Sequence, residues 1–234
     1  MGFAQSWQVF IEALKTSYHN LGRVMLTNFL WFGVSFAPIL AVTYIPFENV
    51  WFFLAGALGT VITFGGATAA LHSSMNQIIA GEEATLKEFW FSFKKFLARG
   101  GVLTFLGGLG FALLIFNIWF STNYSSKIVF FLIGFWLWGI VYWYSVLQFV
   151  FPFLTQQDIK PILAIKRAGL ISLDNVLASF VILVLSTAVI ILSIILGAPL
   201  IIFTASFLAL LQNLALRGIM VKYEQEAGTV EEGE

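Results

Sequence analysis

The distribution of basic residues constrains this chain more than any other feature. When its long apolar stretches are interpreted as membrane spans, all but one of the 12 Lys and Arg residues fall on the same side of the membrane. They are Lys15, Arg23, Lys87, Lys94, Lys95, Arg99, Lys160, Lys166, Arg167, Arg217 and Lys222. Only Lys127 falls on the other side. Because short loops rich in Lys and Arg are retained in the cytoplasm, the pattern predicts a multi-pass membrane protein with both termini cytoplasmic.

The composition supports a membrane protein and excludes several function classes. Hydrophobic residues make up 59% of the chain and charged residues 10%, compared with about 25% charged residues in soluble domains. There is no Cys, which excludes disulfides and thiolate metal sites, and the net charge of zero gives no indication of nucleic-acid binding. Glu12 and Lys15 interrupt the apolar residues near the start, so we expect the first span to act as the insertion signal, with no cleavable signal peptide.

The apolar stretches predict six membrane spans, because a span needs about 20 apolar residues. The last charge-free stretch is about twice that length, and Gly197-Ala198-Pro199 near its middle predicts a tight hairpin. We therefore expect an all-α membrane protein, a six-transmembrane-helix bundle forming one integral membrane domain over residues 1–222, with a disordered acidic tail over 223–234. The predicted spans are 24–45, 50–79, 101–120, 128–155, 176–196 and 199–216.

Three amphipathic segments precede the pairs of spans, over residues 3–20, 85–98 and 160–172. Apolar residues recur in them with helical spacing, so we expect cytoplasmic interfacial helices that lie in the headgroup plane. Thr85 and Glu88 form a capping-box signature, and Pro161 suits the first turn of a helix. The pattern suggests a hypothesis of three repeats, each an amphipathic helix followed by a membrane hairpin.

The residues inside the predicted spans offer little catalytic chemistry. None of these spans contains Asp, Glu, Lys or Arg, which argues against a proton-driven mechanism. His72 lies beside Ser73, but adjacent helical residues point about 100° apart, so His72 cannot act as the base for Ser73. Two distant His residues without Cys or a buried carboxylate do not form a metal site. We expect no enzyme activity, no catalytic residue, no metal and no cofactor.

Small residues form a stripe along the second and third spans. Such stripes allow helix backbones to approach closely in lipid, so these residues are candidates for helix packing, and a path for substrate is the alternative. The candidates are Gly56, Gly59, Thr63, Gly66, Thr104 and Gly108.

The fourth span is rich in aromatic residues and is a weaker candidate for ligand binding. Tyr142 and Trp143 could stack on a sugar ring, with Gln148 and, from the third span, Asn117 as polar neighbours. The same residue types are also common on lipid-facing and interfacial helix surfaces. Both interpretations remain open from the sequence.

Two passages carry a family resemblance. The first comprises Phe64-Gly65-Gly66-Ala67-Thr68-Ala69-Ala70-Leu71 and Phe89-Trp90-Phe91-Ser92-Phe93-Lys94-Lys95, and the second is Phe149-Val150-Phe151-Pro152-Phe153-Leu154. Together they resemble the YesL-like family of bacterial integral membrane proteins of unknown function, over nearly the whole chain to Lys222. The Gly65-Gly66 pair departs from the family, where a Gly-Pro step is expected. The resemblance implies an association with carbohydrate utilisation, including sugar ABC importers.

These observations lead to a functional expectation with two alternatives. We expect a non-enzymatic accessory component of carbohydrate uptake in the bacterial cytoplasmic membrane. Its partners would be the lipid bilayer and an ABC transporter permease or another membrane subunit, contacted through Lys94, Lys95, Lys166 and Arg167. The first alternative is an autonomous small-molecule channel or carrier with a pocket near Thr63, Asn117 and Gln148. The second is a structural subunit of a larger membrane complex.

Overall fold

The computed structural model describes residues 1–44, 50–123, 127–197 and 199–231, and the described chain is helical almost throughout. Its elements are α1 (Phe3–His19), α2 (Leu21–Tyr44), α3 (Val50–Ile79), α4 (Leu86–Thr122), α5 (Lys127–Gln157), α6 (Pro161–Asp174), α7 (Val176–Leu196), the π-helical segment η1 (Leu200–Thr204) and α8 (Ala205–Glu231).

The all-α, six-span prediction is confirmed. Six helical stretches of the described chain are long and apolar enough to cross a membrane: α2, α3, α4, most of α5, α7 and Ile202–Tyr223, which runs from η1 into α8. Helices dominate because a helix satisfies its own backbone hydrogen bonds, which lipid cannot do. The break that separates the last two spans lies at the predicted place. Gly197 ends α7 with φ +72°, a conformation that favours glycine, and Ala198 lies outside the described residues.

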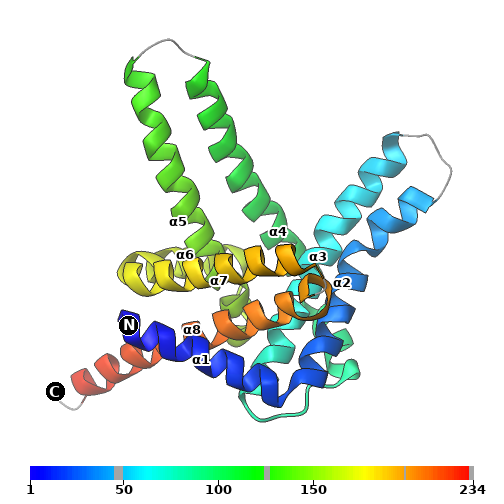
Figure 1. The fold of residues 1–234 in the computed structure, drawn as a ribbon, viewed down its shortest axis with the longest axis vertical. Coiled ribbons are helices and arrows are strands. Elements are labelled where there is room, and N and C mark those ends of the chain that lie inside the picture. The colour runs from blue at the N-terminus through cyan, green and yellow to red at the C-terminus, as the bar shows by residue number, and fades with distance from the viewer. Residues whose placement is uncertain (45–49, 124–126, 198, 232–234) are drawn as a thin grey trace.

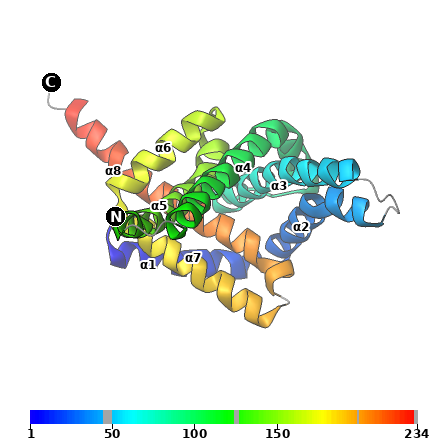
Figure 2. The same cartoon turned by 90° about the horizontal axis from the view of Figure 1, so that it is seen from above.

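The spans form two diverging hairpins above a shared base (Figure 1). The α2–α3 hairpin and the α4–α5 hairpin point in different directions, while α7 and α8 run roughly across the base and in opposite directions to each other. Seen from above, α3 and α4 lie side by side, and α1 lies beside the α7–α8 region (Figure 2). The two hairpins are joined mainly through α3 and α4, which pack closely together.

The central helix of the base is α8. It packs against α1, α3 and α5, and its membrane-length part is the most deeply buried of the six. Phe207, Leu210 and Leu211 of α8 meet Leu71 of α3 and Phe149 of α5 in one continuous buried cluster. Packing of this kind holds helices together in lipid, where burial of apolar surface gives no advantage over contact with acyl chains.

The predicted boundary between an interfacial helix over 85–98 and a span over 101–120 is wrong. Residues 86–122 form one continuous helix, about 55 Å long at 1.5 Å per residue. The helix continues through Gly100 and Gly101. The absence of side chains at these two positions lets α4 cross α3 at very short range. A Cβ added at Gly100 would lie 2.3 Å from the carbonyl oxygen of Gly65, and one added at Gly65 would lie 2.1 Å from that of Gly100.

The starts of the amphipathic segments follow the sequence signals. The Thr85 hydroxyl accepts a hydrogen bond from the Glu88 amide at 3.3 Å, and the Glu88 carboxylate accepts one from the Thr85 amide at 2.9 Å, so the predicted capping box is confirmed. Pro161 occupies the first turn of α6, as predicted. The three-repeat hypothesis stays a hypothesis: α1 and α6 are separate helices, whereas the second amphipathic segment is continuous with its span.

The structure continues α8 through residues 223–231 of the predicted acidic tail, past the end of the apolar pattern. The disorder of the tail stays a prediction. Residues 232–234 of the predicted tail lie outside the described residues.

Candidate functional site

A buried polar centre joins α3, α5 and α8 in the middle of the base. His72 of α3 and Asn213 of α8 are 3% and 0% exposed. The Asn213 side-chain amide donates to the His72 carbonyl oxygen at 2.9 Å, and Asn213 Oδ1 lies 3.2 Å from His72 Nδ1. Gln156 Nε2 of α5 donates to the carbonyl oxygen and Oδ1 of Asn213, both at 3.3 Å. Three spans are thus joined through one asparagine.

The geometry assigns the tautomer of His72. The NH₂ group of Asn213 is oriented toward the His72 carbonyl, so Asn213 Oδ1 is an acceptor and His72 Nδ1 carries the proton. His72 Nε2 is then an acceptor, and it forms no hydrogen bond with any residue in the described part of the chain. The ring lies parallel to Phe151, with centroids 5.8 Å apart and an interplanar angle of 10°. His72 therefore offers one hydrogen-bond acceptor, Nε2, on a ring that Asn213 and Phe151 hold in place.

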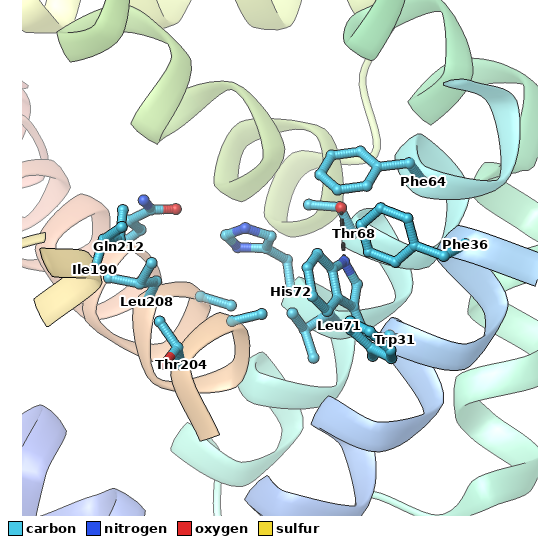
Figure 3. Close-up of a pocket in the computed structure, with 13 residues that line it drawn as sticks. Trp31, Phe36, Phe64, Thr68, Leu71, His72, Ile190, Thr204, Leu208 and Gln212 are labelled. Carbon is cyan, nitrogen blue, oxygen red and sulfur yellow. Dashed lines mark hydrogen bonds between the residues drawn. The ribbon is translucent and has the colours of Figure 1, made fainter. Parts of the chain in front are cut away.

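His72 borders a cavity of about 380 Å³ between the α2–α3 hairpin and α7–α8. Figure 3 shows its ring between the aromatic side chains of α2 and α3 and the α8 residues Leu208 and Gln212. The Trp31 indole N–H donates to Thr68 Oγ1 at 3.0 Å, so this hydrogen-bond donor is already engaged within the protein. The lining is completed by Phe32, Phe36, Phe64, Leu71, Ile190, Thr204, Ala205 and Ala209. The cavity is mostly apolar, with few polar groups left for a ligand.

The π-helical segment positions the α7–α8 wall of the cavity. Thr204 Oγ1 donates to Ser193 Oγ of α7 at 2.7 Å, and the Asn28 side chain of α2 accepts a hydrogen bond from the Ser206 amide at 2.9 Å. In the π-helical turn the backbone hydrogen bonds differ from those of an α-helix. The side chains of Thr204 and Asn28 connect this turn to α7 and α2. Irregular π turns often lie beside binding sites, and this one lies at the cavity.

A second polar cluster links α4 to the turn between α5 and α6. Asp158 lies 2.9 Å from Lys95 Nζ and 2.8 Å from Arg99 Nη1, and both cations lie over the Phe96 ring at 4.9 Å. The hydrogen bond from Lys95 is the largest cause and lowers the pKa of the Asp158 carboxyl. Desolvation opposes it, and the hydrogen bond from Arg99 acts in the same direction as Lys95. Asp158 has φ +50°, a conformation that Asp tolerates better than most residues.

The four predicted partner contacts are all exposed, but their environments differ. Lys95 belongs to the Asp158 cluster, and Arg167 donates a hydrogen bond to the Gln157 side chain. Lys94 and Lys166 form no ion pair or hydrogen bond with the residues that the structure describes, and each borders an apolar hollow. Lys95 and Arg167 therefore have intramolecular partners, whereas Lys94 and Lys166 have none among the described residues.

The six candidates for helix packing also differ in their environments. Added Cβ atoms at Gly56, Gly59 and Gly66 would lie 2.6 Å from Val42, 3.1 Å from Pro38 and 2.9 Å from Leu97, so these glycines lie at close helix contacts. The Thr63 hydroxyl donates to the Ser35 carbonyl oxygen of α2 at 3.0 Å. Among the residues that the structure describes, a Cβ at Gly108 would meet nothing within 4 Å, and the buried Thr104 hydroxyl has no hydrogen-bond partner.

The candidate ligand contacts do not share one site. Tyr142 and Trp143 border a hollow of about 260 Å³ beside α6. There the Tyr142 hydroxyl donates to the Gly169 carbonyl oxygen at 3.3 Å, while the Trp143 indole N–H donates to that of Gly107 at 3.0 Å. Gln148 is buried and donates to the Ser179 carbonyl oxygen at 2.9 Å, and the Asn117 side chain bonds back to Leu113 on its own helix at 2.7 Å.

Sequence reasoning missed Asn213, Gln156 and the cavity residues. Gln212-Asn213 is a pair of amide side chains within the charge-free stretch before Arg217, and this was the available signal. Polar side chains in lipid require partners, so such a pair indicates an interhelical contact. The structure places His72 against α8. Ser73 pairs with Ser92 of α4 at 3.0 Å instead of with His72.

Comparisons with known proteins give one match. The model of a protein family described as "Protein of unknown function, DUF624" matches residues 24–118, which covers the α2–α3 hairpin and most of α4 but less than half of the chain. No curated protein and no solved structure matches the chain. The fold and the match together define a multi-span helical membrane protein. Over residues 24–118 it is similar to a family of unknown function.

Proposed function

We propose that this protein is a non-enzymatic accessory subunit of a larger assembly in the bacterial cytoplasmic membrane. The observation that carries the proposal is a stripe of exposed aromatic side chains on the outer half of α5, in the hairpin that diverges from α2–α3 (Figure 1). Phe131, Phe135 and Trp138 are 84%, 65% and 71% exposed. Their spacing of four and three residues places them on one face of the helix. A continuous stripe of large aromatic side chains favours a protein partner, because such residues dominate interface energetics.

The buried polar centre supports the non-enzymatic part of the proposal. The side chains of Asn213 and Gln156 are engaged with each other and with His72, so they join helices and leave one free ring nitrogen. Within the described residues there is no group of three or more His, Cys, Asp or Glu side chains that could hold a metal. A single acceptor without a neighbouring nucleophile suits positioning or ligand binding better than catalysis.

The association with carbohydrate uptake is the finer part of the proposal. It rests on the resemblance to the YesL-like family, whose members look to be encoded alongside sugar ABC importers. In this role the protein would contact a transporter permease through the α5 stripe and through the exposed cations Lys94, Lys95, Lys166 and Arg167.

Copurification tests this function. The native protein would be extracted in mild detergent, and bound proteins would be identified by mass spectrometry. We expect a transporter permease or its ATPase to be enriched, and we expect the double variant Phe131→Ala/Trp138→Ala to lose it. The matched control is Phe116→Ala/Trp119→Ala on α4, whose side chains are 56% and 59% exposed. A protein that purifies alone, together with unchanged sugar uptake in a deletion strain, would contradict the accessory role.

The cavity beside His72 favours a second candidate, a carrier of small molecules. Its chemistry suits an apolar solute with one hydrogen-bond donor, because a sugar would leave many hydroxyl groups unpaired against the aromatic walls. Flux of such a solute into proteoliposomes containing only this protein would support the carrier function. Recovery of a partner complex without any effect on uptake would instead support a purely structural subunit.

A further inference from the structure

Two apolar hollows meet on the outer surface of α4. One, of about 600 Å³, lies between α3 and α4 and is bordered by Lys94 and by apolar residues as far as Phe105. The other, of about 460 Å³, lies between α4 and the start of α6 and is bordered by Lys160, Ile162 and Lys166. Val102, which is 46% exposed, borders both hollows, and we refer to the two adjoining hollows together as the groove.

Three cations along this groove have no partner in the part of the chain that the structure describes. Lys94, Lys160 and Lys166 form neither ion pairs nor side-chain hydrogen bonds there, although they border an apolar surface. Their neighbours Lys95 and Arg99 both form ion pairs with Asp158. The groove therefore combines an apolar floor with positive charge that the protein does not balance itself.

The N-terminus of α6 adds hydrogen-bond donors to the same place. Lys160 is its N-cap and makes no side-chain cap bond, Pro161 has no N–H, and the first turn contains no acidic residue. The first backbone hydrogen bond of α6 runs from the Ala164 amide to the Lys160 carbonyl oxygen. The preceding amides, those of Ile162 and Leu163, have no acceptor among the described residues. A 14-residue helix with such donors at its N-terminus attracts an anion.

We propose that this groove binds an anionic phospholipid. The phosphate lies at the N-terminus of α6 between Lys160 and Lys166, and an acyl chain lies along the groove toward Phe105. From Val102, which borders the hollow at Lys160 and Lys166, the apolar floor continues to Phe105 of α4 and Leu58 of α3, which suits the first part of an acyl chain. Basic pockets between membrane helices recognise anionic headgroups in this way. Free phosphate would use the donors but not the apolar floor, and Ile162, 74% exposed beside them, favours a lipid.

Native mass spectrometry of the purified full chain in detergent tests the site, independently of any protein partner and hence of the accessory role. Phosphatidylglycerol and phosphatidylcholine would be added separately at equal concentration. We expect phosphatidylglycerol to be retained selectively and Lys160→Gln/Lys166→Gln to weaken its retention by about tenfold or more. Lys160→Arg/Lys166→Arg keeps the charge and should retain the lipid. Excess inorganic phosphate should not displace it.

The matched control is Lys15→Gln/Lys87→Gln, which removes the same charge from two exposed lysines outside the groove. We expect this variant to bind phosphatidylglycerol like the unmodified chain. Equal losses in the control and in the Lys160/Lys166 variant would overturn the proposal, because net charge alone would then explain binding. Equal retention of phosphatidylcholine, or displacement of the lipid by phosphate, would also overturn it.

Discussion

Asn213 is the residue on which the buried polar centre depends. It is fully buried and pairs with both His72 and Gln156, so its loss leaves polar groups of two other helices without partners. We expect Asn213→Leu to lower the free energy of unfolding by about 1 to 2 kcal/mol. Thermal unfolding in detergent measures the effect. Gln212→Leu is the control, since Gln212 is only partly buried and has no hydrogen-bond partner among the described residues. Equal stability of the two variants would show that Asn213 does not hold the helices together.

Gly65 and Gly100 determine how closely α3 and α4 approach. A methyl group on Gly65 would lie 2.1 Å from the Gly100 carbonyl oxygen, so the two backbones must separate. We expect Gly65→Ala to destabilise the protein by about 1 to 3 kcal/mol, measured as a lower unfolding temperature. At Gly108 an added Cβ meets nothing within 4 Å, and Ala favours helix. Gly108→Ala should therefore leave stability unchanged or raise it, and a loss as large as that of Gly65→Ala would refute the crossing geometry.

At the scale of elements, the Asp158 cluster holds the α5–α6 turn against α4. The pKa of Asp158 is lowered in the folded protein, chiefly by the Lys95 hydrogen bond, so the carboxylate adds stability above its unfolded pKa of about 4. This stability is lost as the pH falls through the lowered folded value. We expect the melting temperature of the unmodified protein to fall more steeply below about pH 4 than that of Asp158→Asn. The effect is small, because Asp158 is half exposed.

Asn suits this test because it tolerates the positive φ of residue 158. Glu12→Gln, which removes an exposed carboxylate from α1, is the control and should follow the pH profile of the unmodified protein. If Asp158→Asn kept the full acid-induced loss of stability, other carboxylates would be responsible.

At the scale of the whole molecule, the charge pattern predicts the orientation in the membrane. The chain has no Cys, so single cysteines introduced at chosen loops can be labelled individually. We expect a membrane-impermeant maleimide to label Asn123→Cys, which follows α4, in intact spheroplasts. It should label Glu83→Cys, between α3 and α4, only after lysis. Labelling of Glu83→Cys in sealed cells would reverse the predicted orientation.

The sequence alone determined the number and approximate bounds of the spans, the helix start at Thr85 and the break at Gly197. These features depend on local chemistry, since backbone hydrogen bonds in lipid must close within a helix and caps depend on residues three apart. The same local signals failed at Gly100-Gly101. There the sequence suggested a boundary between two helices, but α4 continues through its close crossing with α3.

Only the tertiary structure decided which helices meet and what lies between them. Small-residue stripes allow several packing arrangements in lipid, so the sequence did not reveal that Gly65 meets Gly100 or that His72 meets Asn213. The cavity beside His72 and the groove at Lys160 are formed by helices far apart in the chain. Such sites depend on the relative placement of whole helices, which long-range packing sets and local sequence patterns do not.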